Sequence, residues 1–425
     1  MIKSGNFKLV NIAVGIEGTD YGFSINQLMS LKYTESIKSA SVRMEIQLTD
    51  TRDGVLSAVQ GMEPVYVEFE DHLENNFTTT LVVYDVQDRL VINGSSKATL
   101  LCCSPDLINN ASTKISKRFG GGGGSTIDII VTDIIENILT SQREIVDFAA
   151  TKNKFSFVSC YWSPFTIIKW LASKAIPAEG GSGANASAGY AFFENARGYN
   201  FLAYDSFATK EYTKKMIVGY EEPELGEPDN TIIPIGTMRV TSAGDILRGL
   251  NYGSYSSKFM TFDVKDMSYI EHNFNISKYY KDVPKMNGDV ELPTYFEKFE
   301  KVTAPTRIMS KIMDTALFTE GTMTQDSTKQ VAQSALREKL FYSKEVEVEY
   351  VGDLDLYVGD TVELTVYKGK DRVLDGSNSG VYVIGQIERE FISSNDRMTS
   401  KVTLYTDSVG NVSETSQTVT DETLK

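Results

Sequence analysis

Apolar and polar residues alternate in two stretches that lie far apart along the chain. Near the start, every second residue from 42 to 48 is apolar, and near the end Val346, Val348 and Tyr350 follow the same period. A period of two places the apolar side chains on one face of an extended segment. Both stretches are therefore predicted to be half-buried β-strands.

Each stretch begins a longer pattern that then follows a similar course. A turn at Asp53-Gly54 or at Gly359-Asp360, a second alternating run, a polar loop and a long apolar stretch lead to a Lys-x-Thr-Leu segment. Residues 42 and 346 are 304 positions apart, and so are Lys97 and Lys401. We interpret this as an internal duplication of one β module, against the alternative of chance likeness between two amphipathic sheets.

The segment between the two modules carries helical signals. Apolar residues from Ile127 to Ile138 fall on one helix face, with Ser125 or Thr126 as the N-cap. Ser163 is positioned to cap a second helix that begins at Pro164. A hairpin is predicted around the polar turn 194–198, and shorter helices around 243–250, 306–318 and 334–341.

These elements predict a β-rich mixed α+β fold in five parts. They are a first β module over residues 1–114, an α/β domain with helix and hairpin over 115–204, a connecting region over 205–335, a second β module over 336–409 and a flexible C-terminal tail over 410–425. The tail is assigned because it is rich in Ser, Thr and Glu and has too few apolar side chains to offset its ordering entropy.

Bulk composition narrows the function classes. A chain of 425 residues is long enough for about three domains of roughly 150 residues each. Its net charge of −15 argues against a nucleic-acid reader, which needs clustered Lys and Arg. Three cysteines suit a reducing compartment, and we see neither a secretory signal at the first residues nor an apolar stretch long enough to span a bilayer. We therefore expect synthesis and folding in a cytoplasm, without membrane insertion.

Candidate chemical sites each have a simpler structural interpretation. His72 and His272 lack the neighbouring ligands of a metal site or a histidine base. Glycines 120–124 precede a helix but lack the lysine of a phosphate-binding loop, which favours a hinge. Asp353, Asp355 and Asp360 lack the spacing of a calcium loop, which favours turns between strands.

The remaining candidates are equally weak as catalytic groups. Glu194 and Asp205 are two of many acidic residues, and Trp162 and Trp170 are placed to pack in a core. The segment Gly181-Ser182-Gly183 has no strand leading into it, as a nucleophile elbow requires. The sequence therefore predicts no catalytic residues, no cofactor-binding residues and no metal ligands, and hence a protein that is not an enzyme.

Several segments resemble the baseplate central hub proteins of T-even-like contractile-tail phages, including those of marine phages. The resemblance spans most of residues 1–410 and is poor over 205–335. The segments that carry it are SPFTIIKWLASKA at 163–175, GYAFFEN at 189–195, GYNF at 198–201, GDTV at 359–362, SGVYVI at 379–384 and KVTL at 401–404. These are packing and turn patterns, not catalytic signatures.

The resemblance implies both a fold and a role. Such hub proteins are homotrimers in which each chain carries two tube-like antiparallel β-barrel domains plus smaller α/β insert domains. Their ring has pseudo-sixfold symmetry and joins the hexameric tail tube to the trimeric cell-puncturing spike, the tail lysozyme, beside other baseplate proteins. It forms part of the DNA ejection channel in the virion tail baseplate, which is assembled in the host cytoplasm, and genomic DNA passes through it without specific binding.

Two other function classes stay open at the level of sequence. One is a tail-associated peptidoglycan hydrolase, which zymography on cell wall would reveal. The other is a tail protein that binds a host glycan or receptor through exposed aromatics such as Tyr252, Tyr255 and Tyr279. Under the hub hypothesis, three chains of −15 each would give the channel a negative charge that keeps DNA from adhering.

Overall fold

The computed structural model places most of the chain. It describes residues 7–50, 54–71, 74–92, 95–121, 123–178, 189–219, 231–242, 246–253, 256–263, 267–275, 284–287, 305–313, 334, 337–369, 373–392 and 397–408. The predicted tail over 410–425 lies outside these residues. Within them, no helix is both long and apolar enough to cross a bilayer.

Seven strands form the first module, here defined as β1 to β7. They are accompanied by a short helix, α1 (Val55–Ala58), and a 3-10 turn (Ile25–Gln27). The strands are β1 (Phe7–Ile16), β2 (Thr19–Gly22), β3 (Leu28–Ser36), β4 (Arg43–Asp50), β5 (Pro64–Asp71), β6 (Asn76–Ile92) and β7 (Ser95–Cys103). Their pairing order is β2-β1-β5-β6-β7-β4-β3.

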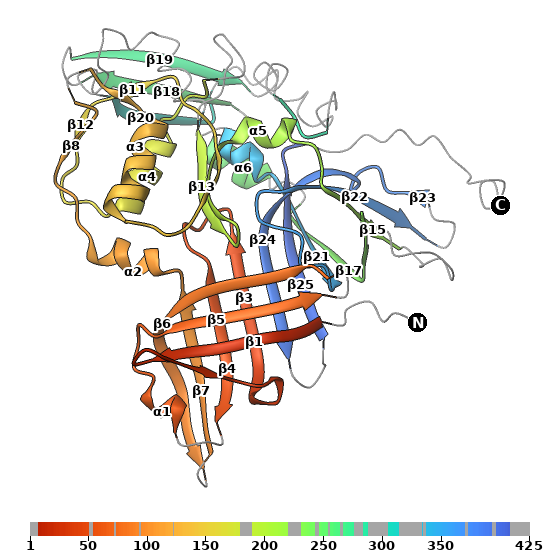
Figure 1. The fold of residues 1–425 in the computed structure, drawn as a ribbon. Coiled ribbons are helices and arrows are strands. Elements are labelled where there is room, and N and C mark those ends of the chain that lie inside the picture. The colour runs from red at the N-terminus through yellow and green to blue at the C-terminus, as the bar shows by residue number, and fades with distance from the viewer. Residues whose placement is uncertain are drawn as a thin grey trace.

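The first module folds over on itself around one apolar core. β1 and β5 cross in front of β3, β4 and β7 (Figure 1). β6 connects the two layers, because its first half pairs with β5 and its second half with β7. The alternating residues from Val42 to Leu48, predicted to face inward, are all fully or almost fully buried in this core.

The second module, here defined as β15–β17 and β21–β25, has the same core arrangement. Its strands are β15 (Lys214–Val218), β16 (Ile232–Ile235), β17 (Thr237–Ser242), β21 (Lys344–Val351), β22 (Thr361–Lys368), β23 (Val373–Leu374), β24 (Gly380–Ile392) and β25 (Arg397–Thr406). The order β22-β24-β25-β21-β17 matches β5-β6-β7-β4-β3 strand for strand. The modules differ beyond β5 and β22, since β1 joins antiparallel and β15 joins parallel.

The register of the ladders supports the duplication. Ile46 faces Leu100 in the first module, and Val348 faces Val402 in the second. Both members of the pair are therefore displaced by 302 residues. The spacing of 304 inferred from the sequence is two residues longer than this offset. Because side chains alternate with a period of two, the inward-facing residues were still predicted on the correct face.

A β-bulge recurs at the same place in both modules. Tyr84 is the extra residue in β6, and Gly385 is the extra residue in β24. Their neighbours across the ladder, Leu101 and Thr403, are again 302 residues apart. A bulge bends a strand, and here it lies where each long strand passes from one neighbour to the next. Chance likeness of two sheets does not account for a shared order, register and bulge.

The two modules are fused through β24. One edge of β24 pairs with β25, and the opposite edge pairs first with β22 and then, over seven residue pairs, with β3 of the first module. Figure 1 shows β24 beside β3 at the centre of the molecule. The result is one large, mainly antiparallel sheet of 15 strands.

The α/β insert over residues 105–209 has its own core above the first module. Its elements are α2 (Pro105–Ser112), β8 (Arg118–Phe119), β9 (Ser125–Thr126), α3 (Ile127–Asp133), a π-helical turn (Ile134–Ile138), β10 (Ile145–Phe148), β11 (Lys154–Phe155), β12 (Phe157–Val158), α4 (Pro164–Ala172), β13 (Tyr190–Asn195), β14 (Gly198–Ala203) and α5 (Tyr204–Thr209). The helices predicted after Thr126 and Ser163 and the predicted hairpin are confirmed.

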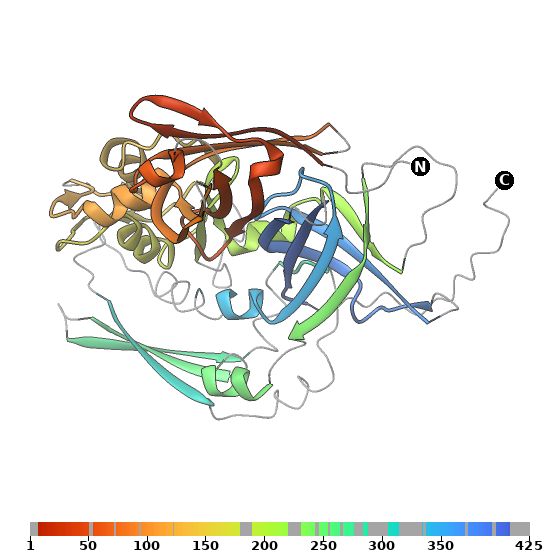
Figure 2. The same ribbon diagram turned by 90° about the horizontal axis from the view of Figure 1, so that it is seen from below.

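A separate three-stranded sheet corrects one prediction. Its strands are β18 (Ser256–Asp263), β19 (Ser268–Asn275) and β20 (Arg307–Met313), and Figure 2 shows them apart from the two modules, with α6 (Ile246–Tyr252) nearby. The helix predicted over 306–318 is wrong in its described part, because β20 pairs in parallel with β18. A short apolar run fits either element, and only this pairing decides between them.

The fold class is a β-rich α+β fold, as predicted. Among the described strands, neither module closes into a separate barrel. Beyond its pairing with β22, the same edge of β24 pairs with β3 of the neighbouring module. The helix predicted over 334–341 is present at Ser334 and over residues 337–341.

Candidate functional site: the seam between the two modules

The seam is the ladder between β3 and β24, and its two faces differ. On the solvent side, Lys32 lies opposite Glu390 and forms an ion pair of 3.0 Å with Glu388. A hydrogen bond to Glu388 raises the pKa of Lys32. This pair is half exposed, so it fixes register more than it stabilises the fold.

The inner side of the seam holds two fully buried charged residues. Glu35 is 0% exposed and Arg389 is 1% exposed, and the closest approach between their charged groups is 3.9 Å. Burial raises the pKa of Glu35, and the nearby Arg389 opposes that rise. Charges are tolerated in an interior when they are paired and hydrogen-bonded, and here this condition is met in part, because Nε and Nη1 of Arg389 have no hydrogen-bond partner among the described residues.

Glu35 connects three parts of the chain. Its carboxylate accepts hydrogen bonds from the Tyr33 hydroxyl at 3.0 Å, the Ala196 N–H at 2.9 Å and the Val358 N–H at 3.2 Å. These donors belong to the first module, to the hairpin turn of the insert and to the loop before β22. One carboxylate therefore holds both modules and the insert in register.

Arg389 completes the same network from the second module. Its Nη2 donates to the carbonyls of Leu354 at 3.0 Å and Leu356 at 2.5 Å. Its guanidinium lies 5.1 Å from the ring centre of Phe77, which comes from β6. Arg389 thus fixes the loop before β22 and contacts the core of the first module.

A second buried carboxylate joins the insert to the first module. Glu194 on β13 accepts hydrogen bonds from Arg143 Nε at 2.8 Å and from the Val42 N–H at 3.2 Å. Burial raises the pKa of Glu194 to about 7, although Arg143 and the hydrogen bonds act in the opposite direction. Nothing in the sequence marks Glu194 for a particular role, and its role in the fold is structural.

This raised pKa predicts a pH-dependent stability. A glutamate in the unfolded chain has a pKa of about 4.3, so between that value and about 7 the folded state binds more protons than the unfolded state. The free energy of unfolding should therefore fall as pH rises through this window, by at most about 1.4 kcal/mol per unit. Urea unfolding followed by circular dichroism at pH 5, 6, 7 and 8 measures the slope. Glu194→Gln should flatten it, and an unchanged slope would contradict this assignment.

The aspartates weighed as calcium ligands are used in ion pairs. Asp353 lies 2.7 Å from Lys214, and both side chains are buried. Asp360 lies 2.7 Å from Arg197. Asp353 follows Gly352 in a turn with positive φ, as the turn interpretation predicted. In the part of the chain that the structure describes, no cluster of three or more His, Cys, Asp or Glu is arranged to hold a metal.

The glycine run begins with a packed residue, Gly120, whereas a Cβ at Gly121 or Gly123 would have no neighbour within 4 Å. Gly120 has a φ of +80°, and a Cβ there would lie 2.0 Å from the Phe155 carbonyl oxygen. Gly121 accepts a hydrogen bond from Ser156 at 2.9 Å. The interpretation of the run as a hinge stays a prediction.

Of the other residues named from the sequence, some are packed or paired in the structure and the rest lie outside the described residues. Trp162 and Trp170 contact each other, with ring centres 5.6 Å apart, in the insert core, as predicted. Asp205 is paired with Arg337, and His272 is buried on β19. His72, Gly181-Ser182-Gly183, Tyr255 and Tyr279 lie outside the described residues.

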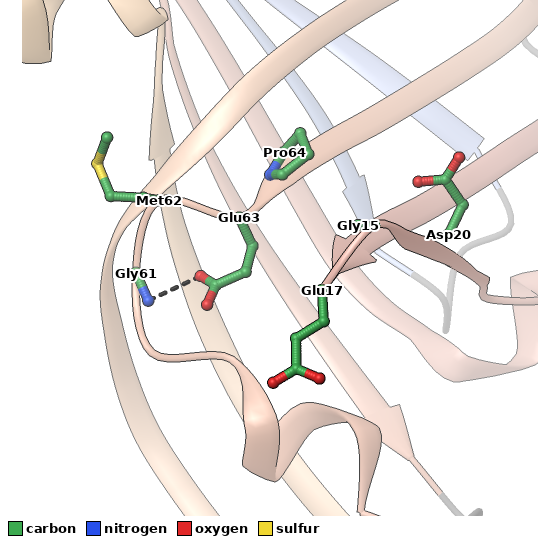
Figure 3. A pocket seen from close by; sticks show the side chains of 8 residues that line it. Gly15, Glu17, Asp20, Gly61, Met62, Glu63 and Pro64 are labelled. Atoms are coloured by element: carbon green, nitrogen blue, oxygen red, sulfur yellow. Dashed lines mark hydrogen bonds between the residues drawn. The ribbon is translucent and has the colours of Figure 1, made fainter.

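A surface hollow beside the β1–β2 turn is lined by acidic residues, yet their contacts do not indicate a binding or catalytic site. It is lined by Glu17, Asp20 and Glu63 together with glycines and Pro64 (Figure 3). Glu63 is turned toward the backbone and accepts hydrogen bonds from the Gly61 N–H at 2.7 Å and the Gln60 N–H at 2.9 Å. It therefore shapes its own turn.

The comparisons with known proteins concern the fold. No protein-family model and no curated protein matches the sequence. The tail protein from Neisseria meningitidis MC58 superposes with a TM-score of 0.58 at 8% identity, covering 95% of this chain and 98% of that one. The 43 kDa tail protein of prophage MuSo2 from Shewanella oneidensis gives 0.55 at 10% identity, covering 93% and 97%. The resemblance predicted from the sequence is thus confirmed, and this chain has the fold of phage tail proteins.

Proposed function

We propose that this chain is the structural hub of a phage tail baseplate. The observation that carries the proposal is the duplicated module, in which one strand order, one ladder register and one bulge position occur twice. The end-to-end fold likeness to tail proteins supports it. The buried ion pairs described above join the modules and the insert.

Symmetry explains how such a hub would work. A closed ring docks face to face only on a partner with compatible repeats. Three chains with two similar modules each offer six units to a hexameric tail tube, and they keep true threefold symmetry for a trimeric spike. In this proposal the modules act as two tube-like barrel units whose walls are completed in the ring.

The partners and the domain division follow from the same proposal. The tail tube hexamer, the spike or tail lysozyme and other baseplate proteins are the expected neighbours. The predicted boundaries 1–114, 115–204, 205–335 and 336–409 are kept as approximate, since the insert elements run from α2 at Pro105 to α5 at Thr209. The region 205–335 contributes strands to the second module and contacts on the spike side. Genomic DNA passes through the ring without specific binding, favoured by a net charge of −15 per chain.

Mass measurement of the purified full-length chain tests the assembly. Light scattering after size exclusion should give three times the chain mass of 47.2 kDa. End-on electron microscopy should then show a ring with six similar lobes around a hole. A stable monomer at micromolar concentration, or a ring with three unequal lobes, would contradict the proposal.

A further inference from the structure

The seam between β24 and β3 occurs once among the described strands. Because the module is duplicated, each of these two strands has a counterpart in the other module. β6 is the counterpart of β24, since both carry the bulge and pair with equivalent strands. β17 is the counterpart of β3, because Met238 faces Val348 as Leu31 faces Ile46. Each chain therefore carries a second half-seam on β6 and another on β17.

Both second halves have a free edge among the described residues. Beyond its bulge, β6 pairs only with β7, whereas the matching part of β24 pairs with β25 and β3. β17 pairs only with β21, whereas β3 pairs with β4 and β24. Open strand edges expose unpaired backbone donors and acceptors and invite another strand.

Side-chain burial shows the same difference between occupied and open edges. Phe391, near the end of β24, is 1% exposed because it enters the core of the first module beside Leu31. Val91 occupies the matching position on β6 and is 63% exposed, and its neighbour Leu90 is 51% exposed. On the counterpart strand Val240 is 39% exposed. Exposed apolar side chains beside an open strand edge are typical of a surface that binds another protein chain.

We propose that the end of β6, which carries Leu90 and Val91, pairs antiparallel with β17 of the next copy of this chain. The register of the internal seam assigns the partners. Phe391 faces Leu31, so Val91 faces Met238 of the next copy, and Glu390 faces Lys32, so Leu90 faces Arg239 of the next copy. Val91 then covers the edge of the next copy's second core, on which Met238 already packs.

The charged residues of the proposed seam also resemble those of the internal seam. The internal seam is fixed by the ion pair between Lys32 and Glu388. Arg239 takes the position of Lys32, and Asp88 follows directly after Gln87, the residue that matches Glu388. Arg239 on β17 is thus placed near Asp88 of β6, while the neighbouring Arg89 donates to the Val59 carbonyl, and this favours the register over its neighbours.

The consequence is a ring built from two versions of one contact. The β24–β3 seam joins modules within a chain, and the β6–β17 seam joins modules between chains. The contact is heterologous, so it closes only when the rotation per chain divides a full turn. The inference rests on the trimer proposed above and names the surfaces that would form it.

Disulfide trapping tests the register on the full-length chain. Val91→Cys and Met238→Cys are combined with Cys160→Ser, since Cys160 is exposed while Cys102 and Cys103 are buried. After mild oxidation, a non-reducing gel should show covalent dimers and trimers and nothing larger. The matched control pairs Val91→Cys with Thr241→Cys, three residues out of register at about 10 Å, and should give at most a small fraction of the product.

Charge reversal gives a second, non-covalent measurement. Arg239→Glu and Leu90→Lys each place like charges across the proposed seam and should raise the dissociation constant of the assembly at least about tenfold. Combining them restores an attractive pair and should recover affinity. Both positions are exposed, so circular dichroism should show an unchanged fold.

The outcomes separate this inference from the proposed function. A trimer by mass that gives no Val91–Met238 cross-link and ignores the charge reversals overturns the seam and leaves the hub proposal standing. A cross-link confined to monomers, which means contact within one chain, also overturns it. A parent chain that stays monomeric contradicts the hub proposal itself.

Discussion

Replacing Arg389 with alanine is expected to lower the free energy of unfolding by about 3–5 kcal/mol, because it breaks a buried ion pair by removing one partner. Glu35 would keep its three donors and lose the cation beside it. The carbonyls of Leu354 and Leu356 would lose their donor, and the loop before β22 its anchor. The loss should be smaller at pH 5 than at pH 8, since an unpaired buried carboxylate becomes neutral at lower pH.

The measurement should report on the sheet and not on the insert. Both tryptophans, Trp162 and Trp170, lie in the insert, so far-ultraviolet circular dichroism in urea is the suitable signal. Glu35→Gln combined with Arg389→Met removes both charges and should recover most of the loss, as buried pairs replaced together often do. A double variant no more stable than Arg389→Ala would show that the carbonyl contacts, not the charge pair, dominate.

The sequence was informative where structure is local. Period-two runs marked β4 and β21, Ser163 and Pro164 marked the start of α4, and the turn at 194–198 marked the β13–β14 hairpin. Each of these signals is contained within about ten residues. β20 was not predicted in this way, because its partner strand β18 lies far away along the chain and pairing with it outweighs local preference.

The seam could be located from sequence only in part. Arg389 falls between Ile387 and Phe391 in an alternating run, at a position where the pattern demands an inward apolar residue. That mismatch was a readable sign of a buried charge. Its partner was not readable, because Glu35 lies in a strand that approaches β24 only after both modules have folded. The duplication could be inferred from the sequence, whereas the bulges could be identified only from the strand pairing in the structure.

Arg337, which no sequence signal marked, is the second site where a large effect is expected. Its Nε lies 2.6 Å from Asp205, its Nη1 lies 2.6 Å from Asp407, and its Nη2 donates to the Pro284 carbonyl at 3.1 Å. The side chain is 1% exposed and joins the helix before β21 to α5 and to the end of β25.

Arg337→Ala should cost about 3–5 kcal/mol in the same urea experiment, because the Asp407 side chain, 0% exposed, would lose its cation. Arg337→Lys is the matched comparison. It keeps the charge, yet an ammonium group cannot span two carboxylates and a carbonyl in the fixed fork of a guanidinium. We therefore expect an intermediate loss for lysine. If lysine proved as stable as arginine, charge alone would suffice at this junction, and if alanine cost less than about 1 kcal/mol the junction would not hold the second module together.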